Sequence, residues 1–246
     1  MKKLKFIQTL GMVMLLFISF VATDFTAEAK KQDDPAQRPI VVVINPGCQE
    51  VENKQKESVG PGAWSRVAED MVGAKGAVTE NNEYDLNLEV AKKTQKALLD
   101  KGFVVQMTRT TNDVDINNAE RAMVANTIDA DLYISIYSSS KSKKDAGVSV
   151  MCETADNPYN FGAYKECRLL ADTLLGSISE RTSYNNGDVV ETDDLIGINW
   201  CTVPNAMVRV GNLNNEADDE KLAAEEYQQQ LAEGIAAGVE SYFTQK

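Results

Sequence analysis

Apolar and polar positions follow one another along this chain in blocks that predict strands alternating with helices. The run Ile-Val-Val-Val-Ile at 40–44 is apolar and β-branched throughout, which is typical of a strand buried on both faces of a parallel sheet. Between 84 and 101 apolar residues recur at helical spacing, and Gly102 follows as a stop signal. Similar blocks predict strands at 103–107, 132–137, 147–151 and 206–211, and helices at 118–128, 164–180 and 218–243. This order predicts a three-layer α/β/α fold with a mostly parallel central sheet.

Two polar stretches interrupt the pattern, and we expect the first to be a long loop and the second to hold a turn. The first, 49–82, contains Gly-Pro-Gly at 60–62, and the second covers 185–194. Ligands of such folds bind beyond the carboxyl ends of the parallel strands. Cys48 directly follows the first predicted strand and Tyr137 ends the third, so we expect both at that rim.

The amino-terminal segment has the pattern of an export signal. Lys2, Lys3 and Lys5 precede a mainly apolar run at 6–22, and Ala-Glu-Ala at 27–29 fits a cleavage site. We expect residues 1–29 to be a cleaved signal peptide, the alternative being a retained membrane anchor. Residues 30–39 then form a flexible lead-in to one domain at 40–246. The mature protein would be secreted, with no stable membrane span.

Composition excludes several classes of function. The 246 residues include 25 Lys and Arg against 37 Asp and Glu, a formal net charge of −12, which argues against nucleic-acid binding. The chain has no histidine, which excludes Ser-His-Asp and Cys-His nucleophilic sites and zinc held by imidazoles. The four cysteines leave the redox state open: Cys48–Cys201 and Cys152–Cys167 disulfides, or four buried thiols.

Several short motifs occur together in one characteristic order over residues 40–243. They include Val-Ile-Asn-Pro-Gly at 43–47, Glu-Tyr-Asp-Leu-Asn-Leu at 83–88, Glu-Arg-Ala at 120–122 and Gly-Ile-Asn-Trp at 197–200. In these motifs the chain resembles the zinc-dependent N-acetylmuramoyl-L-alanine amidases, which cut peptidoglycan. The resemblance implies an amidase-like domain acting in the cell-wall space.

The resemblance also assigns the family's active-site positions, and most of them are replaced here. The two zinc-binding histidines fall on Cys48 and Tyr137, the zinc-binding glutamate is retained as Glu83, and the catalytic glutamate falls on Arg209. A hydrolytic zinc site needs three protein ligands and a water. Tyrosine is a poor ligand because its phenol ionises near pH 10, and an arginine cation opposes a metal ion. We therefore expect no zinc and no intact catalytic residue.

Two further expectations concern the groove around these positions. Arg209 would replace the metal by forming an ion pair with Glu83, the alternative being independent drift of each position. Trp200 would stack on a ligand or pack in the core, and Asn199 would bind a substrate amide or hold a turn. Arg109 would line the groove or fix loops through carboxylates.

The sequence thus predicts an exported pseudoenzyme that binds a peptidoglycan fragment or a cell-wall protein. The alternative is an active amidase that hydrolyses the N-acetylmuramoyl-L-alanine amide bond with an atypical Cys48 and Glu83 metal site. A third interpretation is a structural exported protein with no ligand. Zinc content separates the first two, because the ligand set differs between them.

Overall fold

The computed structural model describes residues 38–68, 71–138, 142–159, 162–183 and 187–246. Within it, Pro39–Lys246 forms one compact unit. The expected signal peptide at 1–29 and almost all of the lead-in at 30–39 lie outside the described residues. No helix among the described residues is long and apolar enough to cross a membrane.

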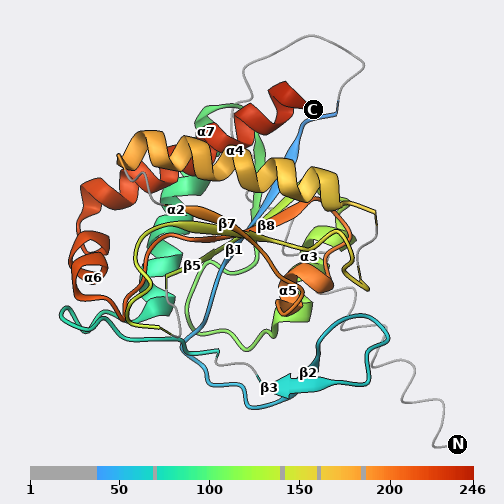
Figure 1. Ribbon diagram of the computed structural model, residues 1–246, viewed down its shortest axis with the longest axis horizontal. Coiled ribbons are helices and arrows are strands. Elements are labelled where there is room, and N and C mark those ends of the chain that lie inside the picture. Colours follow the sequence, from blue (N-terminus) through green and yellow to red (C-terminus); the bar gives the residue numbers. More distant parts are fainter. Residues whose placement is uncertain (1–37, 69–70, 139–141, 160–161, 184–186) are drawn as a thin grey trace, which may run out of the picture. The chain divides into compact units, whose positions relative to one another are not determined.

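A six-stranded sheet forms the centre of the unit, in the order β4-β1-β5-β8-β6-β7. Figure 1 shows the sheet among the helices, with β1, β5, β7 and β8 labelled. Its strands are β1 (Val41–Pro46), β4 (Val104–Met107), β5 (Leu132–Tyr137), β6 (Ser149–Cys152), β7 (Asp188–Glu191) and β8 (Asn205–Arg209). All neighbouring pairs are parallel except β6 with β8, which is antiparallel. The prediction of a mostly parallel sheet is therefore confirmed.

Helices cover both faces of this sheet because its central strands are apolar on both sides. Val42 and Ile44 belong to a core shared with α2 (Glu83–Asp100), α4 (Tyr164–Thr182) and α7 (Glu225–Gln245). Val43, which points to the opposite face, packs with α3 (Asn118–Thr127) and with residues just after the short helix α5 (Ile196–Asn199). Helix α6 (Glu216–Leu222) precedes α7. The three-layer α/β/α fold is confirmed.

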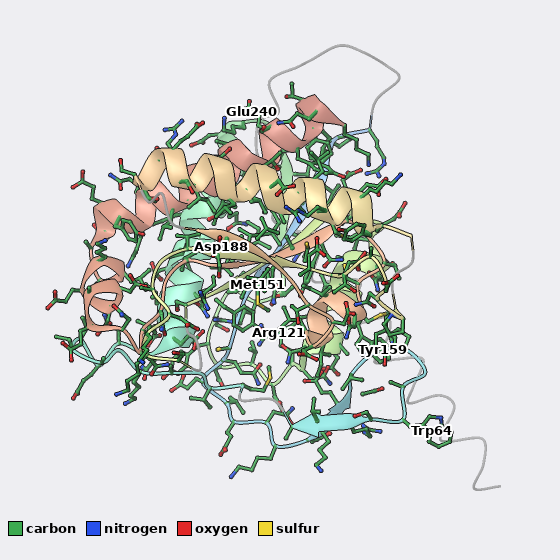
Figure 2. All side chains as sticks on the ribbon, viewed as in Figure 1. Trp64, Arg121, Met151, Tyr159, Asp188 and Glu240 are labelled. Atoms are coloured by element: carbon green, nitrogen blue, oxygen red, sulfur yellow. The ribbon has the colours of Figure 1, made fainter. Side chains whose placement is uncertain are left out.

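Both polar stretches that interrupt the pattern contain strands, so the loop expected at 49–82 is in part a hairpin. Residues 49–82 include the antiparallel hairpin of β2 (Lys56–Ser58) and β3 (Arg66–Ala68), and 185–194 includes β7. All of β3 and most of β7 are exposed, so neither carries the apolar signal that predicts a buried strand. Trp64, between β2 and β3, is 99% exposed and projects away from the domain (Figure 2).

Two buried carboxylates hold the long segment between β1 and α2 in place. Glu57 on β2 accepts hydrogen bonds from the Asn118 side chain (3.2 Å) and the Ala119 backbone N–H (2.9 Å) at the start of α3. Asp219 on α6 accepts from the backbone N–H groups of Val78 (2.7 Å) and Thr79 (2.8 Å). Parts of this segment line the rim of the sheet, so the hydrogen bonds of Glu57 and Asp219 help to position the residues there.

Neither disulfide considered from the sequence is formed. All four cysteines, Cys48, Cys152, Cys167 and Cys201, are buried thiols. Cys167 accepts a hydrogen bond from the Asn205 backbone N–H, and Cys201 donates one to the Val203 carbonyl. Of the alternatives that the sequence left open, the structure has the four buried thiols and neither the Cys48–Cys201 nor the Cys152–Cys167 pair.

Candidate functional site

A pocket of about 430 Å³ lies at the carboxyl ends of the central strands, where ligands of parallel sheets bind. Cys48, Glu83, Tyr137 and Arg209 all line it, so the structure brings together the four positions assigned from the sequence. The other lining residues are Asn45, Gly73, Ala74, Asn118, Ser135, Met151, Asp194, Leu195, Ile196, Gly197, Met207 and Asn214.

Glu83 is the first residue of α2, and its carboxylate is fully buried. One carboxylate oxygen, Oε2, accepts from the Ala74 backbone N–H at 2.9 Å, and the other, Oε1, accepts from the Ser138 backbone N–H at 3.1 Å. Two backbone donors thus satisfy both oxygens. The carboxylate ties the segment before α2 to the end of β5.

The Cys48 and Glu83 side chains lie close together on either side of Gly73, which has no side chain to push them apart. A Cβ atom built on Gly73 would lie 2.6 Å from Glu83 Oε2 and 2.7 Å from Cys48 Sγ. Gly73 also has a φ of 77°, a left-handed conformation that favours glycine. Cys48 itself has a φ of 59°, so the chain turns sharply after β1 and presents the thiol to the pocket.

Tyr137 ends β5, and its ring packs directly over Gly47. A Cβ at Gly47 would lie only 2.5 Å from two ring atoms. The Tyr137 hydroxyl donates a hydrogen bond to Asn118 Oδ1 at 3.2 Å. Burial raises the pKa of the Tyr137 phenol well above its ordinary value, with a smaller contribution from Cys48. The phenol therefore stays protonated and acts as a hydrogen-bond donor.

Arg209 ends β8, directly opposite Tyr137 in the register of β5 and β8. Its nearest carboxylate among the described residues is Asp145, with 3.8 Å between Nη1 and Oδ2, which is longer than a hydrogen bond. Its Nε atom is buried and has no hydrogen-bond acceptor there. The expected ion pair of Arg209 with Glu83 is not formed, because backbone N–H groups already satisfy that carboxylate.

The residues of the pocket do not fit the zinc ion that the family's hydrolases use. Tyr137 remains protonated, Arg209 is a cation, and both Glu83 oxygens accept backbone hydrogen bonds. Of the four positions, this leaves the Cys48 thiol as a suitable zinc ligand. A zinc site needs three protein ligands, so one thiol is not enough. No group of three or more Cys, Asp and Glu side chains suited to a metal ion occurs in the part of the chain that the structure describes.

Two buried arginines shape the turn after β1. Arg109 donates to the carbonyls of Pro46 (3.0 Å), Gly47 (2.9 Å) and Tyr84 (2.8 Å). Arg121 donates to Asn45 Oδ1, Gln49 Oε1 and the carbonyls of Pro46 and Cys48. Burial and, to a smaller extent, the neighbouring Arg121 cation lower the pKa of Arg109 to about 10. The sequence suggested carboxylate partners, whereas these acceptors are mainly backbone carbonyls.

Asn199 and Trp200 donate hydrogen bonds to the β2–β3 hairpin and do not line the pocket. Asn199 is 1% exposed and donates to the carbonyls of Val59 and Asp193, both at 2.8 Å. Trp200 Nε1 donates to the Ser58 carbonyl at 2.9 Å, and its ring packs against the core that includes Val43. Of the alternatives drawn from the sequence, the structure favours a turn-holding Asn199 and a packing Trp200. Arg109 also lies outside the set of pocket-lining residues.

Sequence reasoning missed the apolar wall of the pocket. Met207 lies two residues before Arg209 on β8, so both side chains share one face of the sheet. Met151 on β6 is paired with Met207, and Figure 2 shows it beneath the centre of the sheet. The period-two spacing of Met207 and Arg209 could have revealed this wall, but the antiparallel placement of β6 beside β8 has no local signal.

Comparisons with known proteins agree with this architecture. A family model described as N-acetylmuramoyl-L-alanine amidase matches residues 42–241. The YqiI protein of Bacillus subtilis is 27% identical over 163 residues, which are 66% of this chain and 75% of that protein. The germination-specific N-acetylmuramoyl-L-alanine amidase of B. subtilis is 26% identical over 179 residues, covering 67% of this chain and 72% of that protein. The crystal structure of the amidase Ami1 from Mycobacterium smegmatis has the same fold, with a TM-score of 0.73 at 19% identity over 84% of this chain and 98% of that one.

Proposed function

The chain belongs to the N-acetylmuramoyl-L-alanine amidase family, and from that premise we propose that it is a pseudoenzyme that binds a peptidoglycan fragment without hydrolysing it. The observation that carries the proposal is the position of Arg209. Its guanidinium lines the pocket at the family's catalytic glutamate position, beside the protonated Tyr137.

Electrostatics at this position oppose metal-assisted hydrolysis. A unit cation 4 Å from another costs about 4 kcal/mol at an effective dielectric constant of 20, and a divalent ion doubles that cost. Arginine also remains protonated at any ordinary pH, so Arg209 takes no proton from an attacking water. Both effects point to binding as the function of the pocket.

The proposed setting is the cell-wall space. Export through a signal peptide at 1–29 would place the domain outside the membrane, where peptidoglycan is found. The partner would be a peptidoglycan fragment or a cell-wall protein. The formal net charge of −12 disfavours nucleic acid as a partner.

An active amidase with an atypical metal site is the second candidate. The proximity of Cys48 and Glu83 over Gly73 favours it, and Asp194 adds another carboxylate to the same pocket. Under this alternative a metal would bind the Cys48 thiolate, and Glu83 would have to exchange backbone hydrogen bonds for coordination.

One set of assays separates the two candidates. The purified protein is incubated with isolated peptidoglycan, with and without added zinc, and new amino termini are counted alongside metal content by elemental analysis. The germination-specific amidase of B. subtilis is the positive control. We expect no release and no stoichiometric metal, but co-sedimentation with the wall. Chelator-sensitive release would establish the active amidase instead.

A further inference from the structure

We propose that the pocket recognises a free carboxylate on a peptidoglycan fragment through Arg209, and that this carboxylate is the lactyl group of muramic acid left after amide cleavage. The inference rests on the proposed function and deepens it. It makes the chain a binder of the product that its hydrolytic relatives release.

The guanidinium of Arg209 has hydrogen-bonding capacity that the described residues leave unused. Its Nε is buried without an acceptor, and Nη1 is 3.8 Å from the Asp145 carboxylate. The Arg209 side chain is 15% exposed and lines the pocket. Buried donors in native proteins are almost always satisfied, so the unsatisfied Nε marks the guanidinium of this pocket-lining residue as one that a ligand acceptor would complete.

The shape of the donor indicates which acceptor fits. A guanidinium presents parallel N–H donors that match the two oxygens of one carboxylate, and the pairing is strongest where apolar walls exclude water. Met151, Met207 and Ile196 provide such walls beside Arg209. The ligand therefore has a carboxylate at one end and an uncharged body.

The other charges in the pocket favour a single negative charge over several. Glu83 and Asp194 both line it, and Asp145 lies 3.8 Å from Arg209 Nη1, so a phosphate dianion would meet several carboxylates. Glu83 is held by the backbone N–H groups of Ala74 and Ser138 and does not compete for Arg209. One monovalent carboxylate is the anion that this set of charges tolerates best.

The bond that gives the family its name indicates where that carboxylate comes from. Hydrolysis of the N-acetylmuramoyl-L-alanine amide adds water, leaving a carboxylate on the muramoyl lactyl group and an amine on the peptide. Before cleavage the same acyl group is a neutral amide with a single carbonyl oxygen. Arg209 discriminates between these states, so an amide hydrolysis must precede binding by this chain.

Isothermal titration of the purified protein with four small probes tests the inference. They are N-acetylmuramic acid, its methyl ester, N-acetylmuramoyl-L-alaninamide and the dipeptide L-Ala-D-Glu. We expect N-acetylmuramic acid to bind at least about tenfold more tightly than the ester or the alaninamide, as befits one charge-assisted hydrogen-bonded pair. The dipeptide carries the alternative carboxylates of the stem peptide, so a preference for it would overturn the lactyl assignment.

Variants then connect the preference to Arg209. R209M should remove it, and R209K, which keeps the charge but loses the paired donors, should reduce it. R181M makes the same change at an exposed arginine paired with Glu233 on α7, and should leave binding unchanged. Thermal unfolding of each variant verifies folding. Equal binding of all probes, or a preference that survives R209M, would overturn the inference while wall binding by the wild type still supports the proposed function. If the wild-type protein did not co-sediment with isolated cell wall at all, the proposed function itself would be contradicted.

Discussion

Glu57 on β2 and Asn118 at the first turn of α3 are joined by a hydrogen bond of 3.2 Å, and Asn118 in turn accepts one from the Tyr137 hydroxyl. The surface hairpin is thereby connected to the wall of the pocket through a single buried amide. Because Glu57 also accepts from the Ala119 backbone N–H, it stabilises the amino terminus of α3.

Removing the Glu57 carboxylate should destabilise the fold. E57A leaves the Asn118 side chain and the Ala119 N–H without their buried acceptor, so we expect the free energy of unfolding to fall by about 1–3 kcal/mol. Urea unfolding followed by circular dichroism measures the change. E52A is the matched control, since the Glu52 side chain is 60% exposed and pairs with the exposed Lys54. Equal stabilities of E57A and E52A would contradict the role assigned to Glu57.

Asp219 should protect the loop before α2 from hydrogen exchange. Its fully buried carboxylate accepts from the backbone N–H groups of Val78 and Thr79 and from the Thr79 hydroxyl at 2.6 Å. In D219A we expect both amides to exchange much faster and stability to fall by about 2–3 kcal/mol. Exchange read by mass spectrometry on peptides covering 76–81 measures this, with E220A at an exposed neighbour as control. Unchanged protection in D219A would refute the anchor.

Glu153 should make stability depend on pH in an unusual direction. The residue is 3% exposed, and its Oε1 has no hydrogen-bond partner among the described residues. Burial raises the pKa of Glu153 from 4.5 to about 7; a hydrogen bond with Cys167 opposes the rise, and the nearby Asp193 carboxylate contributes to it. Between these values the folded state keeps a proton that the unfolded state loses, so stability falls as pH rises through that range. The loss reaches at most about 3 kcal/mol above pH 7.

The variant E153Q isolates this contribution because glutamine stays neutral. The free energy of unfolding of each protein is measured by urea unfolding at pH 5 and at pH 8. Relative to E153Q, we expect the wild type to lose about 2–3 kcal/mol of stability between these two pH values. E180Q, at an exposed glutamate on α4, should show no comparable change. A difference that is flat with pH would show that Glu153 does not titrate in this range.

The cysteines should behave as inert thiols. Burial raises the pKa of Cys152 and of Cys201 to about 12, so little reactive thiolate forms at neutral pH. We expect slow alkylation of the native protein and four alkylated cysteines after denaturation without reductant, counted by intact mass. Fewer than four would reveal a disulfide and contradict the structure.

The strongly patterned parts of the fold could be predicted from the sequence. The run around β1 is buried on both faces, and α2 carries apolar residues at helical spacing. In both elements burial requires apolar residues in a pattern that can be recognised in the sequence. The exposed strand β3 and the edge strand β7 left no such signal. Their hydrogen bonds come from partners far along the chain or from the opposite arm of a hairpin.

The site was predictable as a set of neighbours but not as a set of interactions. Placement at the strand ends brought Cys48, Glu83, Tyr137 and Arg209 together as expected. The partners of Glu83 were missed because they are backbone N–H groups of Ala74 and Ser138, which every residue possesses. Side-chain identity alone says nothing about donors of that kind.

The register that sets Tyr137 against Arg209 constrains how this protein can evolve. Replacement of Arg209 by glutamate alone would put a third acid beside Glu83 and Asp194, with no cation among the described pocket-lining residues to balance it. Replacement of Tyr137 by histidine alone would break its contact with Asn118 and leave the new imidazole beside a guanidinium. Since each single step is unfavourable, these two positions on adjoining strands would have to change together.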